Sequence, residues 1–266
     1  MSPPLTSMRP PSPLLLALEG RAFFEWSAFA AARAWLLRNV PRGDAHPVMV
    51  LPGLIASDRS TGPLRRFLGD CGYHVYPWEQ GFNRGPVADT EQRLLERVQQ
   101  ISARHDGRKV SLIGWSLGGA MARALAVGLP EHVRSVITLG SPLGGDPKAT
   151  NAWRVFEMVS GLKVDDPGLH QRLIAHPEAP FTSIFSKTDG VVHWRLSMAP
   201  ETPCSENIVV QSSHLGLGAN PAVLWAIADR LAQCEGEWQP MDRNGWHSVF
   251  FRELRNHNRL ADLISG

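Results

Sequence analysis

The stretch GWSLGG, residues 114–119, stands where a strand pattern changes to a helix pattern. The apolar run KVSLI (109–113) precedes it, and LGGAMARALAVGL (117–129) follows it with the apolar spacing of a helix. A sharp turn between a strand and a helix favours glycine, because a side chain would meet the neighbouring backbone there. Such a turn exposes its central residue, so the pattern predicts that Ser116 is a nucleophile.

Strand and helix patterns alternate on both sides of this turn. Strand patterns occur in HPVMVLPG (46–53), YHVYPW (73–78), KVSLIGWS (109–116), VRSVITLGSP (133–142), FTSIFSKTDGVV (181–192) and ENIVVQSSH (206–214). Helix patterns occur between them over 61–72, where Thr61 is the candidate cap, over 87–107 and over 117–129, and a last one covers 221–233. This order predicts an α/β fold with a mostly parallel, doubly wound sheet covered on both faces.

Three parts of the chain are expected from these patterns. Residues 1–45 form a proline-rich segment and a helix, residues 46–234 the α/β domain, and residues 235–266 a tail that packs on the domain or stays partly flexible. The alternation pauses before the fifth strand, where two helix patterns predict a small cap inserted over 147–180.

Composition limits the classes of partner. The chain has 266 residues, of which 43% are apolar and 20% charged, and a net charge of +2 without basic clusters, which argues against binding to nucleic acid. Its three cysteines have neither the pairing nor the spacing of a disulfide framework or a zinc site, which favours a reducing, cytoplasmic location. No metal ligand set is predicted.

The helix expected over 22–40 leaves three interpretations open. It contains Glu25 and Arg33, so it does not form the charge-free span of about 20 residues that a bilayer requires, and the short run before Glu19 makes a poor signal peptide. Its aromatic residues spread around the helix. It packs on the domain, lies on a membrane surface as a peripheral contact, or belongs to a targeting segment.

A serine hydroxyl needs a neighbouring base to become a nucleophile at neutral pH. His214 follows the last strand pattern, where a loop at the carboxyl edge of the sheet would bring it beside Ser116. His193 is the alternative base, because it follows an acidic loop residue by four positions. His214 is the predicted base.

The base in turn needs a carboxylate that orients its ring. Asp189 follows a strand pattern and precedes a glycine, so it is the predicted acid; Asp146 and Asp165 are alternatives in the inserted region. Two backbone amides are expected to stabilise the oxyanion: that of Leu117, directly after the serine, and that of Leu54, after the first core strand.

These segments resemble the α/β-hydrolase fold and, within it, bacterial esterases and lipases. GWSLGG is similar to their nucleophile elbow, LPGL (51–54) to their oxyanion loop and GSPLGG (140–145) to the strand end after the elbow helix. TDGVV (188–192) and SSHLGL (212–217) are similar to their acid and histidine loops. The resemblance covers about residues 46–234. The chain departs from it where many lipases carry a His-Gly pair, because it has Pro52 and Gly53 there.

The resemblance implies hydrolysis of a small-molecule or lipid carboxylic ester through an acyl-serine, with no metal or organic cofactor. The same residues suit thioester hydrolysis or acyl transfer, and a non-catalytic lipid or protein binding module is the alternative of another class. No oligomeric state follows from the sequence. Several apolar residues either line an acyl pocket or pack the core: Trp115, Trp153, Phe156, Met158, Val159, Leu162, Trp194 and Leu215.

Overall fold

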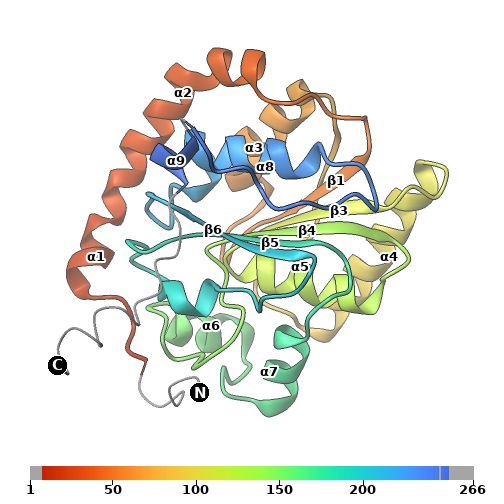
Figure 1. Ribbon diagram of the computed structural model, residues 1–266. Coiled ribbons are helices and arrows are strands. Elements are labelled where there is room, and N and C mark those ends of the chain that lie inside the picture. The colour runs from red at the N-terminus through yellow and green to blue at the C-terminus, as the bar shows by residue number, and fades with distance from the viewer. Residues whose placement is uncertain (1–7, 246, 252–266) are drawn as a thin grey trace, which may run out of the picture.

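Parallel strands form the centre of the molecule (Figure 1). The structure is a computed structural model that describes residues 8–245 and 247–251. Within them, one six-stranded sheet has the order β2-β1-β3-β4-β5-β6, with every pair parallel. The strands are β1 (Pro47–Leu51), β2 (His74–Pro77), β3 (Val110–Trp115), β4 (Val133–Leu139), β5 (Phe181–Ser186) and β6 (Ser205–Val210).

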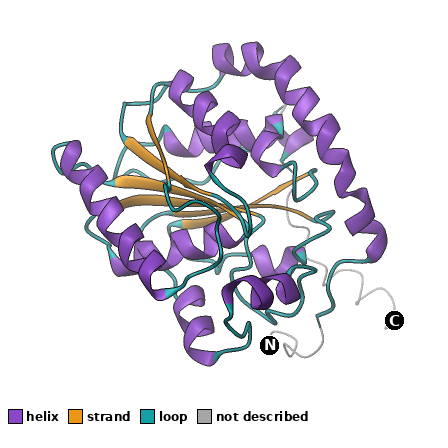
Figure 2. Ribbon diagram, turned by 180° about the vertical axis from the view of Figure 1, so that it is seen from behind, coloured by secondary structure: helices purple, strands orange, loops and turns teal. Residues whose placement is uncertain are grey.

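Helices cover both faces of this sheet, as Figure 2 shows from behind. On one face pack α2 (Ala22–Asn39), α3 (Asp58–Cys71), the short 3-10 helix η3 (Leu217–Ala219) and α8 (Pro221–Leu231). On the other lie α4 (Ala88–Arg104), α5 (Leu117–Gly128), α6 (Trp153–Ser160) and α7 (Pro167–Ile174). The remaining helices are α1 (Pro13–Ala17), η1 (Leu18–Arg21), η2 (Trp194–Ser197) and α9 (His247–Phe250). The predicted doubly wound α/β class is confirmed.

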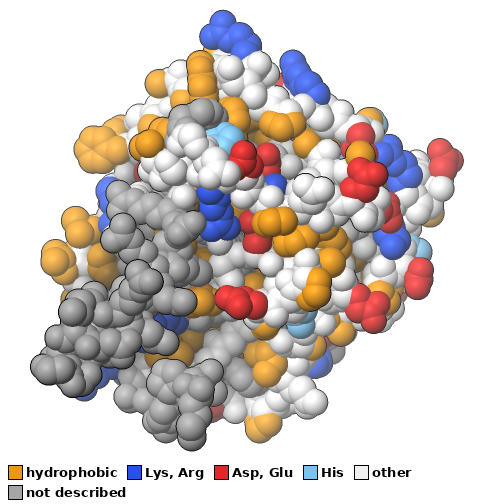
Figure 3. Space-filling view, viewed as in Figure 1, with side chains coloured by type: hydrophobic (Ala, Val, Ile, Leu, Met, Phe, Trp, Pro, Cys, Tyr) orange, Lys and Arg blue, Asp and Glu red, His pale blue; other side chains and the backbone are white. Residues whose placement is uncertain are grey.

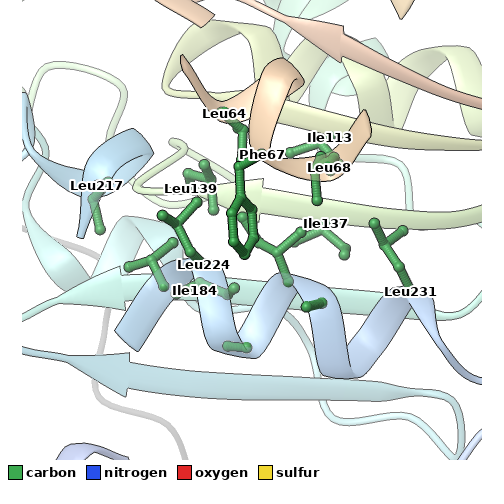
Figure 4. Packing of buried hydrophobic residues seen from close by; sticks show 14 of the residues in the cluster. Leu64, Phe67, Leu68, Ile113, Ile137, Leu139, Ile184, Leu217, Leu224 and Leu231 are labelled. Atoms are coloured by element: carbon green, nitrogen blue, oxygen red, sulfur yellow. The ribbon is translucent and has the colours of Figure 1, made fainter. Parts of the chain in front are cut away.

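The alternation of side chains along each strand builds two cores. In β1, Val48 and Val50 join the core beneath α3 and α8, whereas Met49 and Leu51 join the core beneath α4 and α5. Phe67 of α3 lies at the centre of the first core, among side chains from the sheet and α8 (Figure 4). Because both faces are buried, β1 is a continuous apolar run and β3 is interrupted by one polar residue, Ser111.

One predicted boundary differs from the structure. The third helix begins at Asp58, three residues before Thr61, which was expected to cap it. The Asp58 carboxylate accepts hydrogen bonds from the N–H groups of Trp78 (3.0 Å) and Glu79 (3.2 Å), and these bonds hold the helix start against the end of β2. Thr61 lies inside the first turn, where its hydroxyl donates to Asp58 O (3.2 Å).

The inserted region forms α6 and α7, which lie together beside the sheet (Figure 1). Asp166 caps α7 by accepting a hydrogen bond from Leu169 N (2.7 Å). Arg123 of α5 is buried and connects α5 to this region. Its Nη2 donates to Leu143 O (2.6 Å) and its Nε donates to Leu173 O of α7 (2.9 Å).

The N-terminal helical segment packs on the domain. Phe29 and Leu36 of α2 are buried in the same core as Met241 and Phe251 near the end of the described chain. None of the helices in the described residues is long and apolar enough to span a bilayer. The rest of the predicted tail, residues 252–266, and the first seven residues lie outside the described part of the chain.

Candidate active site

Ser116 occupies a sharp turn between the end of β3 and the start of α5. Its backbone angles, φ 53° and ψ −124°, lie in a region that non-glycine residues rarely adopt. A Cβ added to Gly118 would lie 2.5 Å from Pro52 O, and one added to Gly119 would lie 2.8 Å from Gly114 O. The glycines therefore allow the strained turn that presents the Ser116 side chain.

Asp189 and His214 are brought into contact at the carboxyl edge of the sheet. His214 Nδ1 lies 2.6 Å from Asp189 Oδ2, and both side chains are almost fully buried. The other carboxylate oxygen, Oδ1, accepts hydrogen bonds from Val191 N and Val192 N, both at 2.8 Å. The backbone of the Asp189 loop thus binds Oδ1, and Oδ2 orients the imidazole ring of His214.

The serine and the Asp189–His214 pair both lie next to the end of β4. Ser116 N donates to Leu139 O (2.8 Å). At the next residue, Gly140, an added Cβ would lie 3.0 Å from Asp189 Oδ2 and 3.1 Å from His214 Nδ1. Asp189 engages Nδ1, so Nε2 is the ring nitrogen left for the serine; among the described residues no hydrogen bond joins His214 Nε2 to Ser116 Oγ.

Two carboxylates set the protonation of the imidazole. Burial acts to lower the pKa of His214, but the charge and hydrogen bond of Asp189, with a further contribution from the charge of Glu19, raise the pKa above its ordinary value. The protein therefore favours the imidazolium, the form that a base adopts after taking a proton from serine.

Trp115 links the serine turn to the histidine loop instead of lining a pocket. Its indole Nε1 donates to His214 O (3.1 Å), and its ring is buried in the core beneath α3 and α8. Its position in β3 explains this placement: Trp115 points to the same face as Ile113, away from the cap.

The two residues predicted to supply the oxyanion amides lie at the same cleft as the serine. Leu54 and Leu117 line one cleft with Ser116. Leu117 is the first residue of α5, so its N–H has no acceptor within the helix. The next two N–H groups along the chain have acceptors: Ile55 N donates to Asn83 O (2.7 Å) and Ala56 N donates to Gly53 O (3.1 Å). Leu54 N donates to no acceptor within the described residues.

Asn83 holds the loop of Leu54 and was not among the residues predicted from the sequence. It is fully buried, its Nδ2 donates to Pro52 O (2.8 Å) and its Oδ1 accepts from Gly85 N (2.9 Å). Its backbone N–H also donates to Ala56 O (2.8 Å). A lone asparagine in the polar stretch after β2 is typical of any turn, so only its contacts identify this role.

An apolar cleft of about 90 Å³ opens beside Ser116 under the cap. Of the predicted pocket residues, Trp153 and Phe156 line it. Its lining also includes residues that the sequence did not single out, among them Val164, Leu169, Leu173 and Val192. The cap therefore supplies most of the apolar surface that faces the serine.

Two other predicted pocket residues lie elsewhere. Trp194 stacks on Phe185 with ring centroids 6.3 Å apart, and Lys187 and Arg195 flank its ring. Leu215 is half exposed and is not among the cleft residues, although its backbone lies next to His214. Both residues come after strand ends, but neither lines the cleft.

The alternative base and acids bond to other partners than His214 or Asp189. His193 Nδ1 accepts a hydrogen bond from Arg195 N (3.4 Å). Asp146 accepts from Lys148 N (2.9 Å), and Asp165 pairs with the Lys148 ammonium (2.7 Å). Over residues 8–245 and 247–251, no group of three or more His, Cys, Asp or Glu side chains is arranged to hold a metal ion.

Comparisons with known proteins agree with this fold. A family model described as the alpha/beta hydrolase fold matches residues 47–164. A triacylglycerol lipase from Burkholderia plantarii is 32% identical over 155 residues, which cover 55% of this chain and 41% of that protein. A triacylglycerol lipase from Pseudarthrobacter phenanthrenivorans is 34% identical over 139 residues, which cover 49% of this chain and 41% of that protein. The chain thus spans less than half the length of these relatives.

Solved structures show the same fold. The pyrethroid hydrolase PytH superposes with a TM-score of 0.53 at 19% identity, covering 73% of this chain and 99% of that one. The lipase BlEst2 of Bacillus licheniformis superposes with a TM-score of 0.53 at 14% identity, covering 73% of this chain and 95% of that one. At these identities the likeness concerns the fold alone.

Proposed function

We propose that this chain, a member of the α/β-hydrolase fold superfamily, is a carboxylic-ester hydrolase that works through an acyl-serine intermediate. The observation that carries the proposal is the buried Asp189–His214 pair, 2.6 Å apart, beside a serine held on a strained turn. The similarity to two triacylglycerol lipases supports the choice of a carboxylic ester over other acyl compounds.

In the proposed reaction, Ser116 Oγ attacks the acyl carbon while His214 Nε2 takes the hydroxyl proton. The amides of Leu54 and Leu117 stabilise the oxyanion, which contributes several kcal/mol in enzymes of this kind. The imidazolium then protonates the leaving alcohol. A water molecule, deprotonated by the same imidazole, then attacks the acyl-serine; the bond to Ser116 Oγ breaks, the imidazolium returns the proton to Oγ, and the acid is released. Every step uses side chains, backbone amides and water, so the proposal includes no cofactor.

The acyl part of the substrate is proposed to occupy the cleft under the cap. Trp153 and Phe156 present apolar surface beside Ser116, and a cleft of about 90 Å³ favours a short acyl chain unless the cap moves. Turnover of water-soluble nitrophenyl esters of increasing chain length tests this. Activity that declines beyond short chains supports a closed cap, whereas a preference for emulsified long-chain esters argues for a cap that opens.

Labelling with a fluorophosphonate tests the proposed nucleophile. The wild-type protein should be labelled and Ser116→Ala should not, with both proteins folded by circular dichroism. A folded wild-type protein that resists labelling and hydrolyses no ester would favour the non-catalytic lipid or protein binding module. Parallel assays with matched esters and thioesters, with and without an alcohol acceptor, separate ester hydrolysis from thioester hydrolysis and acyl transfer.

The outer face of the N-terminal segment is proposed to contact a lipid surface. Leu14, Leu16, Leu18, Phe23 and Phe24 are all exposed, the two phenylalanines by more than 70%. Hydrophobic side chains gather on the edge of the molecule formed by α1 and α2 (Figure 3). Exposed apolar clusters on a helix that lies along a domain are typical of peripheral membrane contact.

Vesicle binding tests this contact. Sedimentation with vesicles of phosphatidylcholine and phosphatidylglycerol should recover the wild-type protein and lose the double variant Phe23→Ser/Phe24→Ser. Val127→Ser, which removes an exposed apolar residue of α5, is the control. Equal recovery of all three proteins would argue against the contact.

A further inference from the structure

A buried carboxylate from the N-terminal segment joins the two loops that carry the acid and the base. Glu19 Oε1 accepts hydrogen bonds from Gly190 N (2.8 Å) and His214 N (2.9 Å), and Oε2 accepts one from Leu215 N (2.9 Å). The residue is about 5% exposed. One side chain therefore binds the residue after Asp189 and the backbone of His214 itself.

Two further charged residues of the same segment make equivalent bonds. Arg21 donates to Thr188 O (2.6 Å) in the loop of the acid and to Ser212 O (2.9 Å) in the loop of the base. Glu25 accepts from Ser213 N (2.7 Å) and from the Ser212 hydroxyl (2.9 Å). We call residues 12–25 the N-terminal clamp, residues 187–193 the acid loop and residues 211–217 the histidine loop.

Both loops contain a glycine where the clamp approaches. A Cβ added to Gly190 of the acid loop would lie 2.6 Å from the carbonyl carbon of Leu15. A Cβ added to Gly216 of the histidine loop would overlap the Glu25 carboxylate. The two loops are thus shaped to receive the clamp, which a helix resting loosely on the surface would not require.

Resting on the ester hydrolysis proposed above, we infer that Glu19 is a positioning residue: the N-terminal clamp fixes the acid loop and the histidine loop relative to each other, and so keeps His214 in line with Asp189 and Ser116. Glu19 is not among the residues that line the cleft beside Ser116. It acts through the backbone of the two loops, so its loss should affect turnover more than substrate binding.

The charge of Glu19 has a second effect that a purely structural residue would lack. The ionisable groups around His214 are Asp189 on the acid loop, Glu19 on η1, and Arg21 and Glu25, which bind the residues directly before it. Burial opposes the protonation of His214, whereas the negative charges of Asp189 and Glu19 favour it and raise its pKa. Removing the Glu19 charge should therefore lower the pKa of the base.

The experiment compares Glu19→Gln and Glu19→Asp with Glu206→Gln as the matched control. Glu206 is similarly buried and bonds to Arg230 (2.6 Å) and to Met241 N (3.1 Å), but it lies in β6 and, among the described residues, makes no hydrogen bond to either loop. We would measure kcat and KM from pH 5 to 9 on a water-soluble ester, and the melting temperature of each protein.

Glu19→Gln should lower kcat about tenfold or more and leave KM within about threefold. In Glu19→Gln, the pH at which kcat/KM falls on the acidic side of its profile should be lower than in the wild type. Glu19→Asp keeps the charge, so its acidic fall in kcat/KM should stay close to the wild-type pH. Glu206→Gln should have a lower melting temperature but the wild-type kcat and the wild-type pH profile of kcat/KM. Wild-type kcat and pH profile in folded Glu19→Gln, or equal changes in the control, would overturn the inference.

Two additions keep the result interpretable. If Glu19→Gln does not fold, Arg21→Gln removes clamp bonds from a partly exposed side chain, and an unchanged kcat in that variant overturns the inference. A nuclear magnetic resonance titration of the His214 ring, assigned with His214→Asn, needs no activity. An inert wild-type protein would refute the proposed function, while a lower pKa of His214 in Glu19→Gln would still support the clamp.

Discussion

Replacing Asn83 with alanine should loosen the loop that carries the Leu54 amide. The change removes the bond from Nδ2 to Pro52 O (2.8 Å) and the bond from Gly85 N to Oδ1 (2.9 Å), and it leaves both backbone groups buried without these partners. Each of the two buried groups left unsatisfied costs about 1–3 kcal/mol, partly relieved by water. We expect the free energy of unfolding to fall by about 3 kcal/mol.

The same variant should slow ester hydrolysis. Loss of one oxyanion donor costs about 100- to 1,000-fold in kcat in a well-studied protease, and a displaced amide costs less than a deleted one. We therefore expect kcat to fall about 10- to 100-fold with a small change in KM. Urea unfolding and steady-state kinetics on a nitrophenyl ester measure the two effects on the same protein.

Asn207→Ala is the matched control for this prediction. Asn207 also makes two side-chain hydrogen bonds, accepting from Ala199 N (2.8 Å) and donating to Ala199 O (3.0 Å), but in β6. It should lose stability and keep the wild-type kcat. A folded Asn83→Ala protein with wild-type kcat, or a fall in kcat no larger than that of the control, would refute the role assigned to Asn83.

Three more outcomes follow from buried polar contacts. Burial lowers the pKa of His46 to about 4 in the folded protein, although the hydrogen bond to Asp44 opposes this shift, so on acidification the unfolded chain takes up a proton at this residue before the folded protein does. The contribution of His46 to the free energy of unfolding should be complete above pH ~6.5 and should fall by about 3 kcal/mol towards pH ~4. In urea unfolding at a series of pH values, His46→Gln should show a weaker dependence of stability on pH. Trp115→Phe keeps an aromatic ring in the core but removes the indole N–H that donates to His214 O, so the rate of fluorophosphonate labelling should fall several-fold, and an unchanged rate would contradict this link. Arg123→Leu leaves the carbonyl groups that hold α7 without their donor, so the 165–176 region should become sensitive to limited proteolysis while the melting temperature falls; equal protection in both proteins would count against it.

The elements of the fold could be predicted because their causes are local. The strand pattern of VSLI, the helix pattern after it and the glycines between them each depend on neighbouring residues, and the structure confirms the α/β class that they predict. The start of α3 shows the limit: it depends on the bond between Asp58 and Trp78 N, twenty residues away, so Thr61 was a reasonable but wrong choice of cap.

Placement of side chains around the site was predicted less completely. Trp153 and Phe156 line the cleft, whereas Trp115 faces the opposite core and Trp194 lies on Phe185. All four are large aromatic residues near a predicted site, and their identity does not say which surface they cover. The sheet face and the path of each loop decide that.

The sequence by itself determined the order of strands and helices, the turn at Ser116 and the candidates Asp189 and His214, because each follows from hydrophobic period or from its place at a strand end. Only the tertiary structure decided how these groups are held. The bonds from Gly190 and His214 to Glu19 join residues 171 and 195 positions apart. A carboxylate finds such amides only after the whole chain has folded, so no local pattern could record the contact.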